Sequence, residues 1–232
     1  MAKFDLAQTQ ELTRLFTVPR EERLDTWQQQ LYAAAPDATL MCFDPQVSRG
    51  PDTFPYFDLA IPDPGPVTPF CITHLLDFLL ENGLGCVIWG SSKREGPPEW
   101  VFTYGDLLSY SMFGRFEGPM AQGGSPPEYV KEARQVLVAA PNESFLPTVA
   151  RKAIGNFVRE NYRHPDPKVG LVVDASRDPS QILVINLALE QYQGDQHKLD
   201  MAMRYLFWFL PRGYTIMALP AGWSDADFAK LG

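Results

Sequence analysis

Residues 169–189 read VGLVVDASRDPSQILVINLAL, and this stretch decides the fold of the second half of the chain. Residues 169–174 and 181–189 are apolar runs rich in valine, leucine and isoleucine, and the polar segment 176–179 separates them. Apolar runs of this kind, bounded by polar turn residues, are typical of strands. The stretch therefore predicts a β-hairpin.

Helical and strand patterns flank this hairpin on both sides. Residues 146–161 and 195–209 carry apolar side chains at helical spacing, while 136–140 and 214–219 are short apolar strands. The resulting order is βαββαβ, the ferredoxin-like or split-βαβ sandwich. We assign it to a domain spanning residues 130–232.

The first half predicts a second α/β (α+β) domain over residues 1–120, acidic and rich in aromatic residues. Seven prolines between residues 45 and 69 predict extended loop there, with at most an edge strand at 56–61. Asn82-Gly83 predicts the end of a helix, because glycine accepts the left-handed conformation. The other expected elements are helices at 6–16, 21–35, 68–81 and 106–112, and strands at 39–43, 84–89 and 100–104.

The glycine- and proline-rich segment 118–127 predicts the linker between the two domains. We expect the domains to pack together, because Leu206, Phe207, Trp208, Phe209 and Leu210 follow one another at the end of a helix. Consecutive helical positions point about 100° apart, so one sheet cannot cover all of these side chains. Trp208 in particular is expected to be buried.

The charge is distributed unevenly along the chain, and this distribution limits the kinds of molecule that we expect the chain to bind. The net charge of −8 falls within residues 1–125, and the remainder is neutral. An acidic half repels phosphate backbones, which argues against nucleic acid, and attracts a basic protein partner. No apolar run reaches the roughly 18–20 residues of a membrane span, and residues 1–5 lack an apolar signal core. We therefore expect a cytoplasmic protein that does not bind membranes.

Cysteines and histidines predict neither a disulfide framework nor a metal site. Cys42, Cys71 and Cys86 are an odd, sparse set without a C-x-x-C pair, as expected of reduced thiols in a core. Cys71 and His74 could share a helix face, but two ligands do not complete a zinc site. The nucleophile elbow, the phosphate loop and the dinucleotide-binding loop are likewise missing as sequence motifs, so no catalytic residue, metal or cofactor is assigned.

The richest cluster of aromatic residues lies between residues 87 and 116, where basic residues interrupt it. Aromatic and arginine side chains are the usual hot spots of protein interfaces. We therefore expect a non-catalytic protein that binds another protein. The expected contact surface consists of Lys93, Arg94, Trp100, Tyr104 and Asp106, with Trp100, Phe102 and Tyr104 on one side of a strand.

The second half also resembles a known family. Residues 136–141 (VLVAAP), Leu146-Pro147, the strand at 169–174 and the segment 210–214 (LPRGY) are similar to the C-terminal domain of SseB-type proteins, which are associated with enhanced serine sensitivity. The resemblance covers residues 130–222. It implies a bacterial, cytoplasmic, non-enzymatic domain and supplies no catalytic residues.

Two further hypotheses stay open beside an accessory, regulatory or immunity-type binding protein. One is a small-molecule sensor, with amino acids as the obvious ligands given the resemblance and with homodimerisation left open. The other is a hydrolase that uses carboxylates of the first half. General acid–base catalysis needs two such groups beside one substrate, and the candidates are Asp63, Asp77, Glu95 and Asp106.

Overall fold

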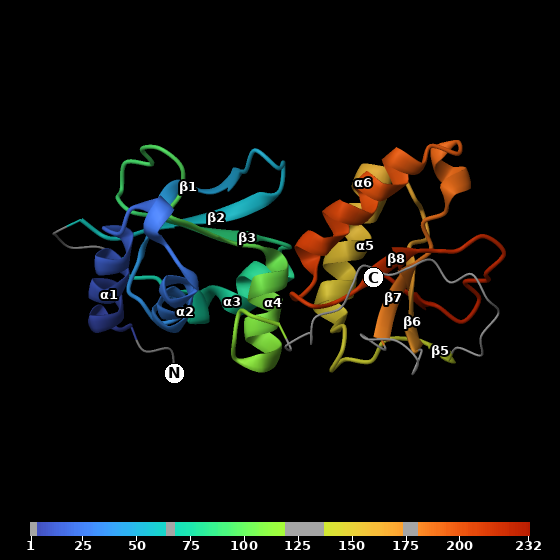
Figure 1. Cartoon of the computed structure of the whole chain (residues 1–232), viewed down its shortest axis with the longest axis horizontal. Coiled ribbons are helices and arrows are strands. Elements are labelled where there is room, and N and C mark those ends of the chain that lie inside the picture. Colours follow the sequence, from blue (N-terminus) through green and yellow to red (C-terminus); the bar gives the residue numbers. More distant parts are fainter. Residues whose placement is uncertain (1–3, 64–67, 119–136, 174–180) are drawn as a thin grey trace. The chain divides into compact units, whose positions relative to one another are not determined.

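The computed structural model describes residues 4–63, 68–118, 137–173 and 181–232 (Figure 1). It confirms a mixed α/β fold with two sheets. The chain divides into two compact units, Met1–Leu107 and Leu108–Gly232, and the division falls within helix α4 (Tyr104–Phe113). The expected linker at 118–127 lies, beyond residue 118, outside the described residues. The expected packing of the two domains stays a prediction.

The first unit begins with helices and then alternates strands with helices. Helix α1 (Leu6–Phe16) has the predicted bounds, whereas the predicted helix at 21–35 is a short 3-10 turn followed by α2 (Asp25–Ala34). Leu24 between them is extended and caps α2, which explains the break. The remaining elements are strands β1 (Met41–Arg49), β2 (Pro55–Ala60), β3 (Gly85–Trp89) and β4 (Trp100–Phe102), and helix α3 (Ile72–Glu81).

Strand β2 corrects the sequence interpretation most clearly. The sheet order is β1-β2-β3-β4, so β2 is a central strand and not an edge strand. It pairs antiparallel with β1 and parallel with β3. The prolines are compatible with this arrangement because Pro55 begins β2 and Pro45 lies in edge strand β1, where the register shifts between Cys42 and Val47.

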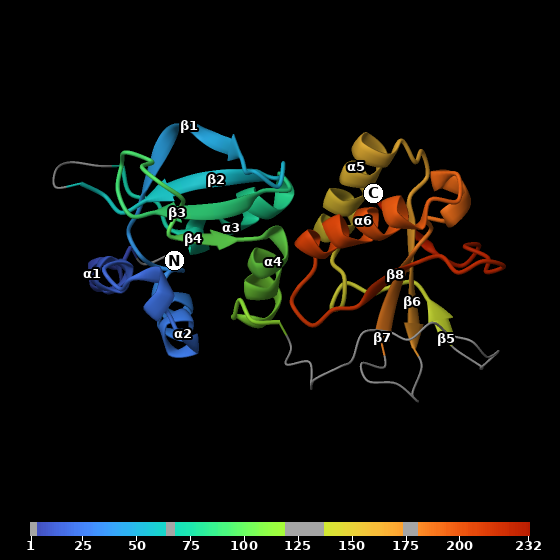
Figure 2. The same ribbon diagram turned by 45° about the horizontal axis from the view of Figure 1, so that its top comes forward.

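Helices α1, α2 and α3 lie on one side of this sheet, as Figures 1 and 2 show. The side chains of a strand alternate between its two faces. Phe57 of β2 contacts Phe78 of α3, with ring centroids 6.0 Å apart, so this face of β2 packs on the helices. Asp58, the next residue along β2, therefore points to the opposite face.

The second unit contains the predicted βαββαβ elements. They are β5 (Leu137–Ala139), α5 (Thr148–Tyr162), β6 (Lys168–Val173), β7 (Gln181–Ile185), α6 (Gln196–Leu206) and β8 (Ile216–Ala218). A 3-10 turn, Phe207–Phe209, follows α6 and carries Trp208, whose burial is confirmed at 8% exposure.

The sheet order of the second unit differs from the ferredoxin-like prediction. The strands lie in sequence order, β5-β6-β7-β8, with β5 antiparallel to β6 and β7 parallel to β8. A split βαβ unit would place another strand between two parallel strands joined by a helix. Here α6 connects β7 and β8, which are direct neighbours. The predicted order of elements along the chain is therefore confirmed, and the predicted split-βαβ strand order is wrong.

Residues 220–232, for which no element was predicted, complete the second unit. Strand β9 (Ala229–Lys230) pairs with the start of β6. Phe228 is buried against Val172 and Val184, with Trp223 packed beside them. Among the described residues, no helix is long and apolar enough to cross a membrane.

Glycines make room for this C-terminal segment. A β-carbon at Gly170 would lie 2.5 Å from the ring of Phe228, and one at Gly155 of α5 would lie 2.0 Å from the carbonyl oxygen of Leu231. Arg159 donates a hydrogen bond to that carbonyl at 2.9 Å. Asn186 donates to the Asp225 carboxylate, which lowers the pKa of Asp225 together with Lys168.

Candidate functional site

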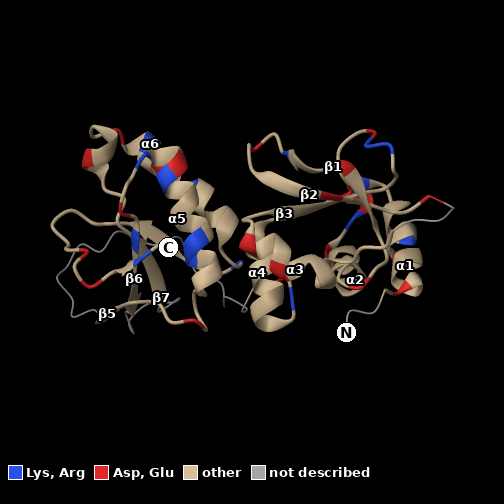
Figure 3. Cartoon of the chain, turned by 180° about the vertical axis from the view of Figure 1, so that it is seen from behind, with Lys and Arg blue, Asp and Glu red and all other residues tan. Residues whose placement is uncertain are grey.

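The loop that joins β3 to β4, residues 90–99, contains the basic residues that the sequence analysis selected. Lys93 and Glu95 are exposed, and Arg94 between them is partly buried. Figure 3 shows adjoining basic and acidic segments in this β3–β4 loop. Arg94 adopts a left-handed backbone conformation with φ 49°, which is uncommon for any residue other than glycine. Contacts of the Arg94 side chain must therefore stabilise it.

The guanidinium of Arg94 binds both strands of the β1–β2 hairpin. Its Nη2 donates to the Pro45 carbonyl oxygen at 2.8 Å and to Oδ2 of Asp58 at 3.1 Å. The guanidinium carbon lies 4.2 Å above the ring of Phe43, within the range of a cation–π interaction. Residues 92–96, which we call the loop tip, are thus fastened to β1 and β2.

Asp58 is the buried anchor of this arrangement and was not selected from the sequence. Its side chain is fully buried, and the indole Nε1 of Trp89 donates to its Oδ1 at 2.9 Å. Both carboxylate oxygens are therefore bound, one by Trp89 and one by Arg94. A buried carboxylate is costly without a cation and hydrogen bonds. A single aspartate inside the apolar strand 56–60 was the signal that could have identified it.

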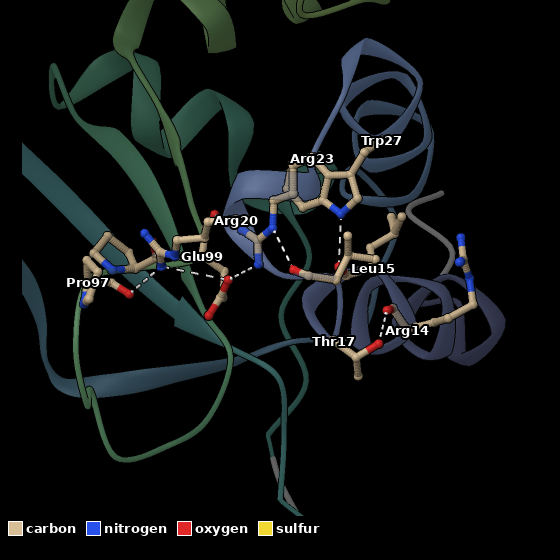
Figure 4. Close-up of polar contacts among 10 residues, drawn as sticks. Arg14, Leu15, Thr17, Arg20, Arg23, Trp27, Pro97 and Glu99 are labelled. Carbon is tan, nitrogen blue, oxygen red and sulfur yellow. Dashed lines mark hydrogen bonds and ion pairs between the residues drawn. The ribbon is translucent and has the colours of Figure 1, made fainter.

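A second set of arginine contacts holds the other end of the β3–β4 loop (Figure 4). Arg20 donates to the carbonyl oxygens of Pro97 and Pro98, both at 2.9 Å. Arg23 pairs with the Glu99 carboxylate at 2.6 Å and lies 4.5 Å above the ring of Trp27. The β3–β4 loop is therefore held within the loop tip by Arg94 and at residues 97–99 by Arg20 and Arg23, while Lys93 and Glu95 stay exposed.

Trp100 packs against aromatic residues of helix α2 and is not part of the loop tip. Its ring lies 5.5 Å from Trp27 and 5.7 Å from Tyr32, both on α2. Trp100 and Phe102 share one face of β4, as predicted, and their rings are 6.3 Å apart. Tyr104, however, lies in α4 and does not continue this face.

Tyr104 and Asp106 are buried, which corrects their assignment to the contact surface. Asp106 caps the first turn of α4: its carboxylate accepts a hydrogen bond from the Thr103 amide at 3.0 Å, and its own amide donates to the Thr103 hydroxyl at 3.1 Å. Such reciprocal bonds satisfy helix N–H groups that otherwise lack partners. Of the selected residues, Lys93 and Arg94 lie together in the loop tip.

The carboxylates of the hydrolase hypothesis lie on four separate elements. Asp63 follows β2 and accepts a hydrogen bond from Ser92, Asp77 lies on α3, Glu95 lies in the loop tip, and Asp106 caps α4. The first three are exposed and Asp106 is buried. Asp63 and Glu95 both lie at the loop tip but are exposed to solvent, and Asp106 is buried against Thr103, so the geometry does not favour this hypothesis.

The described parts of the chain contain no cluster of three or more His, Cys, Asp or Glu residues able to hold a metal ion. Cys42, Cys71 and Cys86 are free thiols. Burial raises the pKa of Cys71 and of Cys86, so both thiols stay protonated at neutral pH. Their environment is that of core thiols.

A smaller polar cluster lies in the second unit, where α5 ends near the turn Leu189–Tyr192. The Ala188 amide donates to Oε1 of Gln191 at 3.0 Å, which leaves the Gln191 Nε2 to face Nδ1 of His164 at 3.4 Å. The proton of a neutral His164 ring therefore lies on Nε2. Within the described chain, His164 Nε2 and the Tyr192 hydroxyl are both buried without a hydrogen-bond partner.

Comparison of the chain with protein-family models, with curated proteins and with solved structures finds no match.

Proposed function

We propose that the chain is a non-catalytic protein, of an accessory, regulatory or immunity type, that binds another protein through the loop tip. The observation that carries the proposal is Arg94, held in a left-handed conformation by Asp58, Pro45 and Phe43 while its neighbours Lys93 and Glu95 stay exposed. A loop that is ordered before binding loses less conformational entropy on association. The arrangement thus favours a contact surface.

Charges around the loop tip favour a basic partner. Asp44 and Asp63 are exposed. Asp44 lies beside the loop tip because Arg94 binds the carbonyl oxygen of the next residue, Pro45, and Asp63 lies there because it binds Ser92. Together with Glu95 they provide three carboxylates that form no ion pair within the described residues, while Asp58 neutralises Arg94. Opposite charges across an interface accelerate association and suppress wrong partners.

A crosslinking experiment tests the proposal. A photoreactive amino acid at position 93 of the full chain should capture one defined protein from a bacterial lysate at low salt. The matched control carries it at Lys152, an exposed lysine of α5 in the second unit. Because the expected partner is basic, Lys93→Glu should then raise the affinity for the captured protein about tenfold, and Lys152→Glu should leave it unaltered. Capture from both positions alike, or from neither, would refute the proposal.

A small-molecule sensor is the second candidate, and the His164–Tyr192 cluster favours it. A buried donor without a partner costs about 1–3 kcal/mol, and a ligand oxygen bound there would recover that cost. A carboxylate, as in an amino acid, supplies such an acceptor. This assignment agrees with the resemblance of the second half to SseB-type domains.

A thermal-shift panel of amino acids tests the sensor. A ligand at about 100 times its Kd should stabilise the chain by about 2.7 kcal/mol. His164→Leu and Tyr192→Phe should abolish the shift, while His197→Leu, which alters an exposed histidine of α6, should preserve it. The sensor hypothesis is excluded if no compound of the panel changes the melting temperature. It is also excluded if the melting temperature of His164→Leu shifts as much as that of the wild type.

A further inference from the structure

Asp58 cannot touch a partner protein, because its side chain is fully buried. It nevertheless binds Arg94, the one loop residue other than glycine whose backbone is left-handed. We infer that Asp58 is the positioning residue of the loop tip, which it orients through Arg94. This inference rests on the proposed function, since the loop tip is the proposed contact surface.

The three contacts of Arg94 differ in how firmly their strands are held. Phe43 and Pro45 belong to edge strand β1, where the register is irregular. Asp58 belongs to β2, which pairs with a strand on each side. The contact with Asp58 is also the only one of the three that involves an opposite charge in a buried position. Asp58 therefore ties the loop tip to the most constrained part of the sheet.

Trp89 fixes the orientation of the Asp58 carboxylate. Its indole N–H holds Oδ1, which leaves Oδ2 directed at Arg94. The Trp89 ring also packs edge-on against Phe43, with centroids 6.3 Å apart, and Phe43 carries the Arg94 guanidinium. These four side chains form a closed set of contacts, and within it Asp58 supplies the charge that keeps Arg94 in place.

Asp58→Asn isolates this charge with little change of shape. The asparagine oxygen can still accept from Trp89, but its amide would place a donor opposite the Arg94 guanidinium. In the full chain we expect the NMR backbone order parameters of residues 92–96 to fall from about 0.85 to below about 0.6, with those of β2, β3 and α5 unchanged. Asp77→Asn, the same change at an exposed carboxylate of α3, should leave the loop tip ordered.

A second variant keeps the inference testable if Asp58→Asn unfolds the first unit. Arg94→Gln removes the partner from the solvent side, where the arginine is 28% exposed, and should lower the order parameters of the loop tip to the same extent. The double variant Asp58→Asn/Arg94→Gln should lower them no further than either single variant, because the two residues act through one contact. A loop tip that stays ordered in Arg94→Gln, or effects that add, would overturn the inference.

The captured partner separates this inference from the proposed function. If the loop tip loosens in Asp58→Asn and affinity falls about tenfold, both are supported. If it loosens while affinity is unchanged, Asp58 positions the loop tip but the contact surface lies elsewhere, which refutes the proposed function. If the loop tip stays ordered, the positioning role is wrong, whatever the partner does.

Discussion

Trp208→Ala should lower the free energy of unfolding by about 3–5 kcal/mol. Trp208 is 8% exposed in the 3-10 turn after α6 and packs edge-on against Phe209, with centroids 4.8 Å apart. Phe209 in turn lies 5.0 Å from Phe157 of α5. Removing the indole leaves a cavity that this aromatic stack cannot close without moving.

The neighbouring residue supplies the control. Phe207→Ala deletes an aromatic ring that is 47% exposed, in the same turn, and should cost less than about 1 kcal/mol. Urea denaturation of the full chain, followed by circular dichroism, measures both variants. Equal costs for the two substitutions would contradict the burial of Trp208.

Gly155→Ala should destabilise the second unit by about 2–3 kcal/mol. Inside a helix this substitution normally stabilises a protein by about 1 kcal/mol, so the expected effect has the opposite sign. The reason is the carbonyl oxygen of Leu231, which would lie 2.0 Å from the new methyl group. Either the C-terminal segment or α5 must move, and the hydrogen bond from Arg159 to Leu231 is then strained.

Glu160→Ala is the control for this prediction, because Glu160 is an exposed residue of the same helix. It should change stability by no more than about 0.5 kcal/mol. The measurement is again urea denaturation, with hydrogen exchange of residues 229–231 as a local probe. Stabilisation by Gly155→Ala would show that the C-terminal segment does not rest on α5.

Local signals in the sequence predicted many helices and strands correctly, but they carry no information about which distant segments become neighbours. The end of α3 at Asn82-Gly83 followed from backbone chemistry, and Gly83 has φ 66°. The βαββαβ order followed from hydrophobic periodicity. Periodicity does not specify which strands become neighbours, however, so the sheet order of the second unit could not be derived from it.

The candidate site was predicted only in part for a related reason. Lys93 and Arg94 were selected because basic and aromatic residues interleave there, and that signal is local. The partner of Arg94 is Asp58, 36 positions earlier. Counting prolines predicted an extended loop with at most an edge strand at 56–61, although Pro55 merely begins the central strand β2. Tyr104 was misplaced because the aromatic pattern does not distinguish the end of β4 from the start of α4. Asp106 was correctly expected at the start of a helix, but it caps that helix from a buried position and is not an exposed contact residue.

The way the C-terminal segment closes the second unit sets an order on its biosynthesis. Strand β6 pairs with β9, and the Leu231 amide donates to the Pro167 carbonyl oxygen, more than 60 residues earlier. A ribosome must therefore release residues 220–232 before β6 acquires these partners and before Phe228 covers Val172 and Val184. The nascent second unit therefore exposes that apolar face until residues 220–232 have left the ribosomal tunnel.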